Sequence, residues 1–378
     1  MSLRVIAEVN LAAIERNAAR LRARLGSHTQ LCAVVKADGY GHGAAPAARA
    51  ALRGGATTLA VATAAEAAEL RRAGLDATIL VLGALSDEEL PLAVAAGAEI
   101  IVWEPGFIDA LRPLVAGADR PIGVHVKLDT GLGRLGTRDP ERALATVRAV
   151  LAGGSGMKLA GVMTHFATAD DDLGFAADQL RRFKPFVAES RALATGGLTV
   201  HAANSAALLR LPDSHFDMVR AGIALYGGDP MNHDPADHGL EPALELKSYV
   251  AAVKPIAAGQ SVGYGRRFVA PRDSVIATLP VGYGDGFVRG LGDNCEVLIG
   301  GRRYPVRGIV SMDNITVEAG LAAPVEVGQQ VTIIGSDGAQ RQTAEELARR
   351  AGTISYELFC AISRRVPRAY HCDGRPCE

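Results

Sequence analysis

Lys36 is the residue of this sequence whose type and setting most clearly suggest chemistry. It follows a short apolar run, residues 33–35, and precedes the segment 37–43, which reads ADGYGHG. An apolar run of this kind is typical of a buried parallel strand. A lysine at the end of such a strand is costly to desolvate, so it needs a partner or a covalent use. The segment alone is equally compatible with a surface turn in which the Lys36 amine reaches water.

The composition indicates a globular protein that is long enough for two domains. The chain has 378 residues, is 48% hydrophobic and carries a formal net charge of −1. This charge gives no electrostatic reason to expect nucleic acid or an anionic membrane as a partner. No apolar run is long enough to cross a bilayer, and the first ten residues lack the features of a signal peptide. We therefore expect a cytoplasmic protein that contacts neither nucleic acid nor membrane.

The cysteines do not suggest a disulfide framework, because their number is odd and they are scattered. They are Cys32, Cys295, Cys360, Cys372 and Cys377. His371 with Cys372 and Cys377 matches no standard zinc spacing, and further ligands are lacking. We expect no metal site, and we expect a frayed C-terminal tail that carries free thiols.

The first two thirds of the chain alternates between strand-like and helix-like segments. An initial strand at residues 4–9 and a helix at about 11–25 come first. Eight apolar, strand-like runs follow, at residues 32–37, 58–62, 78–82, 100–103, 123–128, 159–164, 198–202 and 218–225. Helical segments lie between them, at residues 44–52, 64–73, 87–95, 105–115, 140–151 and 173–195. This alternation implies a parallel sheet with right-handed crossovers, and eight repeats predict a closed (β/α)8 barrel of the TIM type.

An open dinucleotide-binding sheet is the alternative to the barrel. The first turn between strand and helix is rich in glycine, but it lacks the acidic residue that would follow in a dinucleotide fold. We therefore favour the barrel.

The pattern changes near residue 230, where a polar, proline-containing segment begins. Beyond it, the apolar runs alternate and are rich in β-branched residues, at residues 250–256, 274–279, 296–299, 303–310, 314–318 and 330–334. One helix is expected at residues 343–351, where Thr343 and Glu346 have capping-box spacing. The sequence thus predicts an α/β protein with a barrel domain at residues 1–238 and a mostly β domain at 239–378. The strand at 4–9 is expected to pack with the β domain.

The polar residues of the predicted barrel gather at one side of its mouth. In this fold, function lies at the C-terminal ends of the strands. The residues that fall there are Lys36 and Tyr40 on the first strand, Lys127 and Arg134 on the fifth, His165 on the sixth, Asn204 and Ser205 on the seventh, and Arg220, Gly222 and Ile223 on the eighth. Strands two to four end almost without polar groups.

These residue types together suggest pyridoxal phosphate (PLP). A buried lysine amine can attack an aldehyde. Ser205 and the N–H groups of Gly222 and Ile223 follow the seventh and eighth strands, where barrels commonly hold phosphate, and PLP joins an aldehyde to a phosphate. Each residue alone has a structural explanation: for example, Arg220 could pair with an aspartate, and Ser205 could cap the helix that follows it.

Several short segments, ordered along nearly the whole chain, carry a family resemblance. They are residues 35–43 (VKADGYGHG), 126–136 (VKLDTGLGRLG), 163–166 (MTHF), 201–206 (HAANSA), 219–223 (VRAGI), 225–227 (LYG), 262–265 (VGYG), 282–286 (GYGDG), 311–313 (SMD), 356–357 (YE) and 363–368 (SRRVPR). Any one segment is weak evidence, but the ordered set resembles the alanine racemase family.

The resemblance implies a PLP-dependent isomerase that acts as a homodimer, in which the β domain of one subunit completes the active site of the other. Lys36 is expected to bind PLP and to act as one base, and Tyr264 of the partner as the opposing base. Arg220 would face the pyridine nitrogen, and His165 would lie behind Tyr264. The other expected roles are cofactor binding by Tyr40, Asn204, Ser205, Gly222, Ile223 and Tyr356, and substrate binding by Arg134, Met312 and Tyr283. Lys127 matches a lysine that is often carbamylated in the family.

The chemistry implied is the interconversion of L-alanine and D-alanine by two bases, which would supply D-alanine for peptidoglycan. Racemisation needs a base on each face of Cα, within reach of its proton. Three alternatives stay open: a racemase of broader specificity for serine or larger amino acids, a barrel-type PLP decarboxylase, and a PLP-binding carrier without catalysis. A decarboxylase would be expected to have a cysteine–aspartate pair in the β domain, and a carrier would not need that domain.

Overall fold

The computed structural model describes residues 3–116, 120–154, 156–321 and 324–377 of the chain. The chain folds into two units. The barrel unit consists of Glu15–Gly39 and Ala44–Leu225, and the β unit consists of Met1–Ile14, Tyr40–Gly43 and Tyr226–Glu378. The short segment Tyr40–Gly43, which directly follows the turn that begins at Lys36, therefore belongs to the β unit.

The barrel unit contains a closed barrel of eight parallel strands, which confirms the predicted fold class. The strands follow one another in chain order, and the last one pairs with the first. They are β2 (Gln30–Val34), β3 (Thr58–Val61), β4 (Thr78–Val81), β5 (Glu99–Val102), β6 (Ile122–Lys127), β7 (Met157–Met163), β8 (Thr199–His201) and β9 (Met218–Ala221). Every residue of β3, β6 and β9 is buried, as expected for strands covered on both faces.

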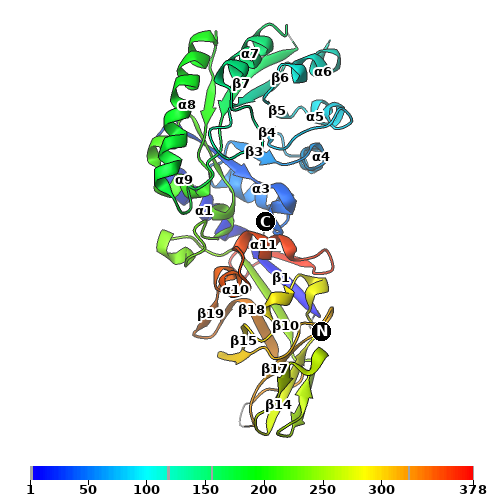
Figure 1. Ribbon diagram of the computed structural model, residues 1–378. Coiled ribbons are helices and arrows are strands. Elements are labelled where there is room, and N and C mark those ends of the chain that lie inside the picture. The colour runs from blue at the N-terminus through cyan, green and yellow to red at the C-terminus, as the bar shows by residue number, and fades with distance from the viewer. Residues whose placement is uncertain (1–2, 117–119, 155, 322–323, 378) are drawn as a thin grey trace. The chain divides into compact units, whose positions relative to one another are not determined.

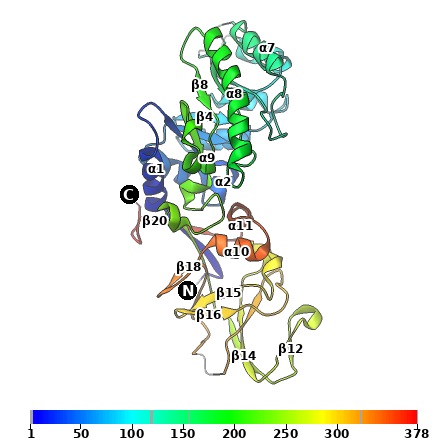
Figure 2. The same ribbon diagram turned by 60° about the vertical axis from the view of Figure 1, so that its left-hand side comes forward.

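Helices connect these strands and lie on the outside of the barrel (Figure 1). They are α3 (Ala44–Arg53), α4 (Ala64–Arg72), α5 (Leu90–Ala95), α6 (Gly106–Val115), α7 (Pro140–Leu151), α8 (Leu173–Leu193) and α9 (Ser205–Arg210). The helix α1 (Leu11–Ala23) precedes the first barrel strand, and α2 (Lys36–Tyr40) is a short turn after β2 whose inner residues have non-helical φ and ψ angles. Both views show α7 and α8 close together beside the later strands (Figure 2). The helix α4 begins with a reciprocal capping box between Thr63 and Glu66, which satisfies two of its free backbone donors.

The β unit contains three sheets, and the prediction of a mostly β C-terminal domain is confirmed. Its strands are β1 (Val5–Asn10), β10 (Leu244–Tyr249), β11 (Ala252–Ile256), β12 (Ser261–Val262), β13 (Phe268–Val269), β14 (Ser274–Leu279), β15 (Glu296–Ile299), β16 (Arg302–Pro305), β17 (Ile315–Glu318), β18 (Gln330–Asp337), β19 (Gln340–Gln342) and β20 (Arg368–His371). The largest sheet has the order β16-β15-β18-β10-β1-β20, a small sheet has the order β11-β14-β17, and β12 pairs with β13. Its helices are α10 (Ala344–Ala351) and α11 (Ser355–Ala361).

The first strand, β1, joins the largest sheet of the β unit. It pairs in antiparallel fashion with β10 and in parallel with β20. Its buried residues alternate with half-buried ones along the whole strand, which is the pattern of a strand with one face in a core. The N-terminal strand and the C-terminal strand of the chain are therefore neighbours in one sheet.

Several element boundaries differ from the sequence prediction, three of them within predicted strands. The strand β2 ends at Val34, before Lys36, because the backbone of the next residues turns into the left-handed region. The run at 218–225 is a strand only to Ala221, and its remainder is a 3-10 turn at Ile223–Tyr226. The run at 303–310 is a strand only as far as Pro305, although the N–H of Val306 still donates to the carbonyl oxygen of Cys295 at 2.9 Å.

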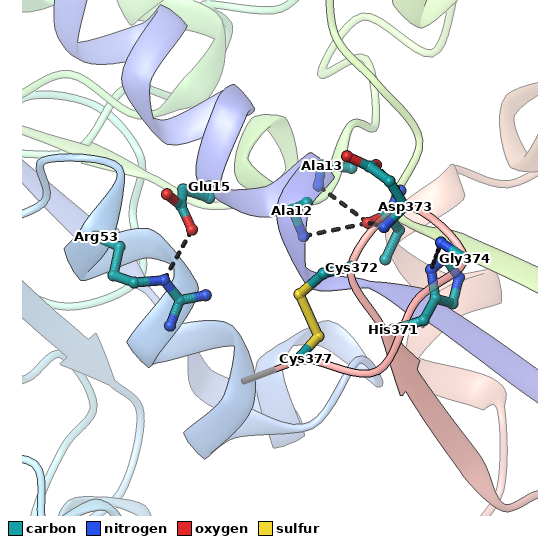
Figure 3. Close-up of a disulfide and its surroundings, with 10 residues drawn as sticks. Ala12, Ala13, Glu15, Arg53, His371, Cys372, Asp373, Gly374 and Cys377 are labelled. Atoms are coloured by element: carbon teal, nitrogen blue, oxygen red, sulfur yellow. Dashed lines mark hydrogen bonds and ion pairs between the residues drawn. A yellow bond between two sulfur atoms is a disulfide. The ribbon is translucent and has the colours of Figure 1, made fainter.

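The C-terminal tail corrects a second expectation, because it is ordered and holds a disulfide. Figure 3 shows Cys372 and Cys377 joined across a turn, and their Cα atoms lie 5.2 Å apart. The backbone N–H of Asp373 donates to Asn10 Oδ1 at 3.2 Å, and Asn10 Nδ2 donates to Asp373 Oδ1 at 2.9 Å. The prediction of a frayed tail with free thiols is wrong, since β20 pairs with β1 and the chain then turns back within five residues.

No helix among the described residues has the length and apolar character needed to span a membrane. No group of three or more His, Cys, Asp or Glu side chains in the same residues could hold a metal ion.

Candidate active site

Lys36 begins a turn whose backbone is left-handed. The next residues Ala37, Asp38 and Gly39 have φ angles of 52°, 53° and 61°, and Tyr40 has a φ of 53°. For a residue with a Cβ atom, this conformation costs about 1–2 kcal/mol, so the three non-glycine residues together cost about 3–6 kcal/mol. Such a cost persists only where surrounding contacts fix the backbone, and it is common at functional sites.

The carboxylate of Glu66 supplies such a contact. One of its oxygens accepts a hydrogen bond from the backbone N–H of Ala37 at 2.7 Å. The other accepts from the N–H groups of Ala62 at 2.7 Å and Thr63 at 3.2 Å. Glu66 therefore caps α4 and also holds the peptide that directly follows Lys36.

Two further hydrogen bonds stabilise the turn. The N–H of Gly39 donates to the carbonyl oxygen of Val35 at 2.9 Å. The carboxylate of Asp38 accepts from the N–H of Ala44 at 2.9 Å, the first residue of α3. The turn is thus tied to β2, α3 and α4, and this fixes the backbone from which the Lys36 side chain extends.

We predict that Glu66→Ala impairs the site more than it impairs the fold. It should lower the free energy of unfolding by about 1–3 kcal/mol, because three backbone donors lose their acceptor, and it should lower activity at least tenfold by relaxing the turn. Urea unfolding and steady-state kinetics measure the two effects. Glu89→Ala is a matched control, since Glu89 and Ser86 also form a reciprocal capping pair. Equal losses of activity in both variants would contradict the role given to Glu66.

Arg220 on β9 is a buried cation of the barrel interior. Its Nη1 donates to His201 Nδ1 at 2.8 Å, and its Nη2 donates to His165 Nδ1 at 3.0 Å. The Nη2 atom also donates to the carbonyl oxygens of Thr164 at 3.1 Å and Ala202 at 2.9 Å. Burial lowers the pKa of Arg220 to about 10, so the guanidinium stays charged at neutral pH.

The two histidines beside Arg220 are neutral. Burial, followed by the charge of Arg220, lowers the pKa of both His165 and His201 well below the ordinary value. Because an arginine donates and never accepts hydrogen bonds, each of these imidazoles must accept at Nδ1. Each therefore carries its proton on Nε2.

Lys127 on β6 is buried and lies among other cations. Burial, the charge of Arg220 and the charge of Arg134 lower the pKa of the Lys127 amine to about 8, although Asp129 opposes the shift. Asp129 itself accepts from the N–H groups of Gly131 and Gly133 at 3.0–3.1 Å. These bonds fix the loop that carries the exposed Arg134.

The residues expected at the phosphate lie where β8 and β9 end. Asn204 caps α9, because its Oδ1 accepts from the N–H of Ala207 at 2.9 Å. The hydroxyl of Ser205 accepts from the N–H of Gly222 at 2.9 Å. Within the described part of the chain, the N–H of Ile223 has no acceptor, and neither does the Nε–H of Arg220. Two unused donors of this kind fit PLP, whose phosphate and ring nitrogen both accept hydrogen bonds.

Two other predicted cofactor contacts, Tyr40 and Tyr356, are neighbours in the β unit. The ring centroid of Tyr40 lies 6.0 Å from that of Tyr356 and 5.1 Å from that of Tyr226. Tyr40 is buried, and burial raises the pKa of its hydroxyl above the ordinary value. It is therefore a neutral phenol, able to donate a hydrogen bond.

The predicted opposing base, Tyr264, is 70% exposed on the β unit. It lies in a 3-10 turn, Tyr264–Arg266, between β12 and β13. The hairpin is anchored because Val262 and Phe268 pack against a small core of Ile256, Ala270 and Ile276. The scaffold is thus held in place while the Tyr264 side chain faces solvent.

Tyr283 and Met312, both predicted to contact substrate, lie on adjoining loops of the β unit and are 45% and 52% exposed. The N–H of Tyr283 donates to the carbonyl oxygen of Ser311 at 3.1 Å. The buried carboxylate of Asp285 accepts from the N–H of Gly282 at 3.0 Å and from both Nη atoms of Arg4 at 2.8 Å. These bonds hold the two loops together and leave the two side chains exposed.

Sequence reasoning missed four residues that support the site: Glu66, Glu99, His125 and His201. Glu66 stands three residues after Thr63, so the capping-box spacing could have indicated it. His125 and His201 are polar residues in buried strands, which is itself a signal. Nothing in the local sequence indicates that Glu99 would bond to His125, because this contact joins two different strands.

Comparison with known proteins covers nearly the whole chain. The model of the alanine racemase N-terminal domain matches residues 9–230, and that of the C-terminal domain matches residues 243–370. The alanine racemase of Symbiobacterium thermophilum is 43% identical over 96% of both chains. Alanine racemase 1 of Bacillus subtilis is 41% identical over 97% of this chain and 93% of its own length.

Solved structures of alanine racemases have the same fold over nearly their whole length. The alanine racemase of the D-cycloserine-producing Streptomyces lavendulae superposes with a TM-score of 0.93, at 36% identity over 98% of both chains. These relatives agree with alanine as the substrate rather than with a broader specificity. The resemblance predicted from the short segments is therefore confirmed, and the chain belongs to the alanine racemase family.

Proposed function

We propose that this chain interconverts L-alanine and D-alanine with PLP as its cofactor. The family is PLP dependent. The observation that carries the proposal is the arrangement inside the barrel unit. There, Lys36 follows the first barrel strand, β2, in a fixed turn, and among the described residues the same barrel presents unused donors at Arg220 and Ile223.

In this proposal, the Lys36 amine binds the cofactor and Arg220 faces its ring nitrogen. The proposed phosphate contacts are Tyr40, Asn204, Ser205, Gly222, Ile223 and Tyr356. When bound, PLP takes up the electron pair that stays on Cα after its proton leaves. Because Arg220 holds its protons tightly, it would leave the ring nitrogen unprotonated.

The two bases act on opposite faces of Cα. Lys36 exchanges a proton on the face of D-alanine, and Tyr264 of the partner subunit exchanges one on the face of L-alanine. A tyrosine has an ordinary pKa of about 10 and needs help to act as a base near neutral pH. His165 would give that help as a donor, since Arg220 fixes its proton on Nε2.

Substrate binding is assigned to Arg134, the backbone at Met312 and Tyr283. Lys127 is proposed to be carbamylated and to orient Arg134. A pKa of about 8 supports this, since only the neutral form of an amine adds carbon dioxide, and a carbamate would also reduce the excess of positive charge around Arg134 and Arg220.

The active protein is proposed to be a homodimer in the cytoplasm, where it would supply D-alanine for peptidoglycan. The exposure of Tyr264, Tyr283 and Met312 supports shared sites. Three residues with roles at one site lie on the surface of the β unit, where a second copy of the chain could cover them.

The experiment that tests the function starts from each enantiomer separately. The purified protein with PLP should convert either L-alanine or D-alanine to an equal mixture of both, because enantiomers have equal free energies. Serine and lysine, assayed in the same way, should react much more slowly. If either pure enantiomer of alanine stays unchanged, the proposed function is wrong. If lysine is turned over as fast as alanine, the proposed specificity is wrong.

A further inference from the structure

Four buried or half-buried side chains form a continuous hydrogen-bonded chain through the interior of the barrel. Arg220 Nη1 lies 2.8 Å from His201 Nδ1, His201 Nε2 lies 2.9 Å from His125 Nδ1, and His125 Nε2 lies 2.9 Å from Glu99 Oε2. The four residues come from β9, β8, β6 and β5. Glu99 is the first residue of β5, so the chain reaches the end of the barrel opposite its mouth.

The direction of every hydrogen bond in this chain follows from its two ends. Arg220 only donates, so His201 accepts at Nδ1 and must donate from Nε2. His125 therefore accepts at Nδ1 and donates from Nε2 to Glu99. Burial disfavours the ionised form of Glu99, but the hydrogen bond from His125 and the nearby charges outweigh it and lower its pKa. Glu99 is thus a carboxylate, which only accepts.

The barrel is shaped to make room for this chain. A Cβ atom on Gly161 of β7 would lie 2.3 Å from His125 Nδ1, and one on Gly123 of β6 would lie 2.5 Å from Glu99 Oε1. The pairing of β6 with β7 also shifts register between Val124 and His125, which brings Gly161 opposite His125. Glycine at both positions thus leaves room for the side chains of His125 and Glu99. The β-bulge places one of these glycines, Gly161, opposite His125.

We propose that Glu99 is a positioning residue for Arg220, which it holds through His125 and His201 by fixing the tautomer of both imidazoles. The chain does not conduct protons. Arg220 donates toward both His201 and His165, so a proton cannot pass through it in either direction. The Glu99 carboxylate ends the series, because it accepts the last hydrogen bond and has no proton of its own to donate.

Loss of the Glu99 carboxylate would disturb the hydrogen bonds one after another, from His125 to Arg220. In Glu99→Leu, the buried Nε2–H of His125 would face an apolar side chain. If His125 moved its proton to Nδ1, it would oppose the Nε2–H of His201. If His201 then moved its own proton, it would face the donor of Arg220. Every arrangement leaves one buried donor without an acceptor, and the disturbance reaches the guanidinium.

The first test reads the tautomers directly and does not depend on the proposed function. Protein labelled with nitrogen-15 in histidine is compared as wild type, Glu99→Gln and Glu99→Leu, with resonances assigned from His125→Asn and His201→Asn. We expect both imidazoles to carry the proton on Nε2 in the wild type and in Glu99→Gln, whose amide oxygen can still accept. In Glu99→Leu, at least one should change. An Nδ1 proton on either imidazole in the wild type would overturn the proposal.

The second test rests on the proposed function and measures kcat and KM for alanine. Glu99→Leu should lower kcat about 10–100-fold with KM little changed, because Arg220 is assigned to the cofactor rather than to alanine. Glu99→Gln should restore kcat. Lys158→Gln is the matched control, since Lys158 lies 3.8 Å from the other oxygen of Glu99 and is 57% exposed. It should behave as the wild type.

The outcomes separate the inference from the function. If the wild type does not racemise alanine, the proposed function is wrong, but the tautomer test still shows whether Glu99 fixes the protons of His125 and His201. If Glu99→Leu keeps both tautomers and a wild-type kcat, the positioning role of Glu99 is wrong. An equal loss of kcat in Glu99→Gln and Glu99→Leu would also overturn it.

Discussion

Replacing Lys36 with alanine is expected to abolish racemisation from both enantiomers, with kcat lower by roughly 10⁴-fold or more. The change removes the amine that is proposed to bind the cofactor and to act as one of the two bases. It should leave the fold intact, because Lys36 is half-buried and the turn is held by backbone contacts to Val35 and Glu66. Steady-state kinetics from each enantiomer and thermal unfolding measure these effects.

The absorbance of the cofactor gives the control for Lys36→Ala. In the wild type, PLP bound to the lysine amine should absorb differently from free PLP, and this band should be absent in the variant. Lys158→Ala removes an exposed lysine of the same barrel and should keep both the band and the activity. A band that survives unchanged in Lys36→Ala would contradict the assignment of Lys36.

Replacing Tyr264 with phenylalanine is expected to remove one base and to make the two enantiomers behave differently. Racemisation should fall roughly 10²–10⁴-fold. In D₂O, the Cα proton of D-alanine should still exchange with solvent, because Lys36 is proposed to serve that face, whereas exchange from L-alanine should be lost. Proton NMR of the two enantiomers, incubated separately, measures the asymmetry. The exposed hydroxyl carries little of the fold, so stability should not change.

Tyr249→Phe is the control for this result, because it removes one hydroxyl from a half-buried tyrosine of the same unit. It should exchange and racemise as the wild type does. If Tyr264→Phe slows exchange from both enantiomers equally, then Tyr264 is not the base for one face alone.

The barrel was predictable because its signals are local and repeated. Apolar runs alternate with helical segments, and each run is long enough to be recognised as a strand without knowledge of its neighbours. The position of Lys36 could also be predicted, since the apolar run ends at that residue. Its left-handed turn could not. Ala37 does not favour a positive φ, and Asp38 adopts one only occasionally; both do so here because Glu66 and Ala44 hold them from other parts of the chain.

The tail and the buried chain behind Arg220 were missed for the same reason. The spacing of Cys372 and Cys377 permits a disulfide, but only the pairing of β20 with β1 makes the tail ordered enough for the turn to close. Glu99 and His125 are 26 residues apart in sequence, and the barrel closure brings them together. Local pattern predicts which elements form, whereas tertiary pairing decides which side chains meet.

The central claim is that Lys36 of one subunit and Tyr264 of its partner complete one active site. Coexpression of Lys36→Ala and Tyr264→Phe chains with different affinity tags allows the mixed dimer to be purified. One of its two sites would contain both intact residues, so it should recover about half of the wild-type activity, although each parent dimer is inactive. A mixed dimer no more active than its parents would contradict the claim, because that result is expected if both residues of a site come from the same chain.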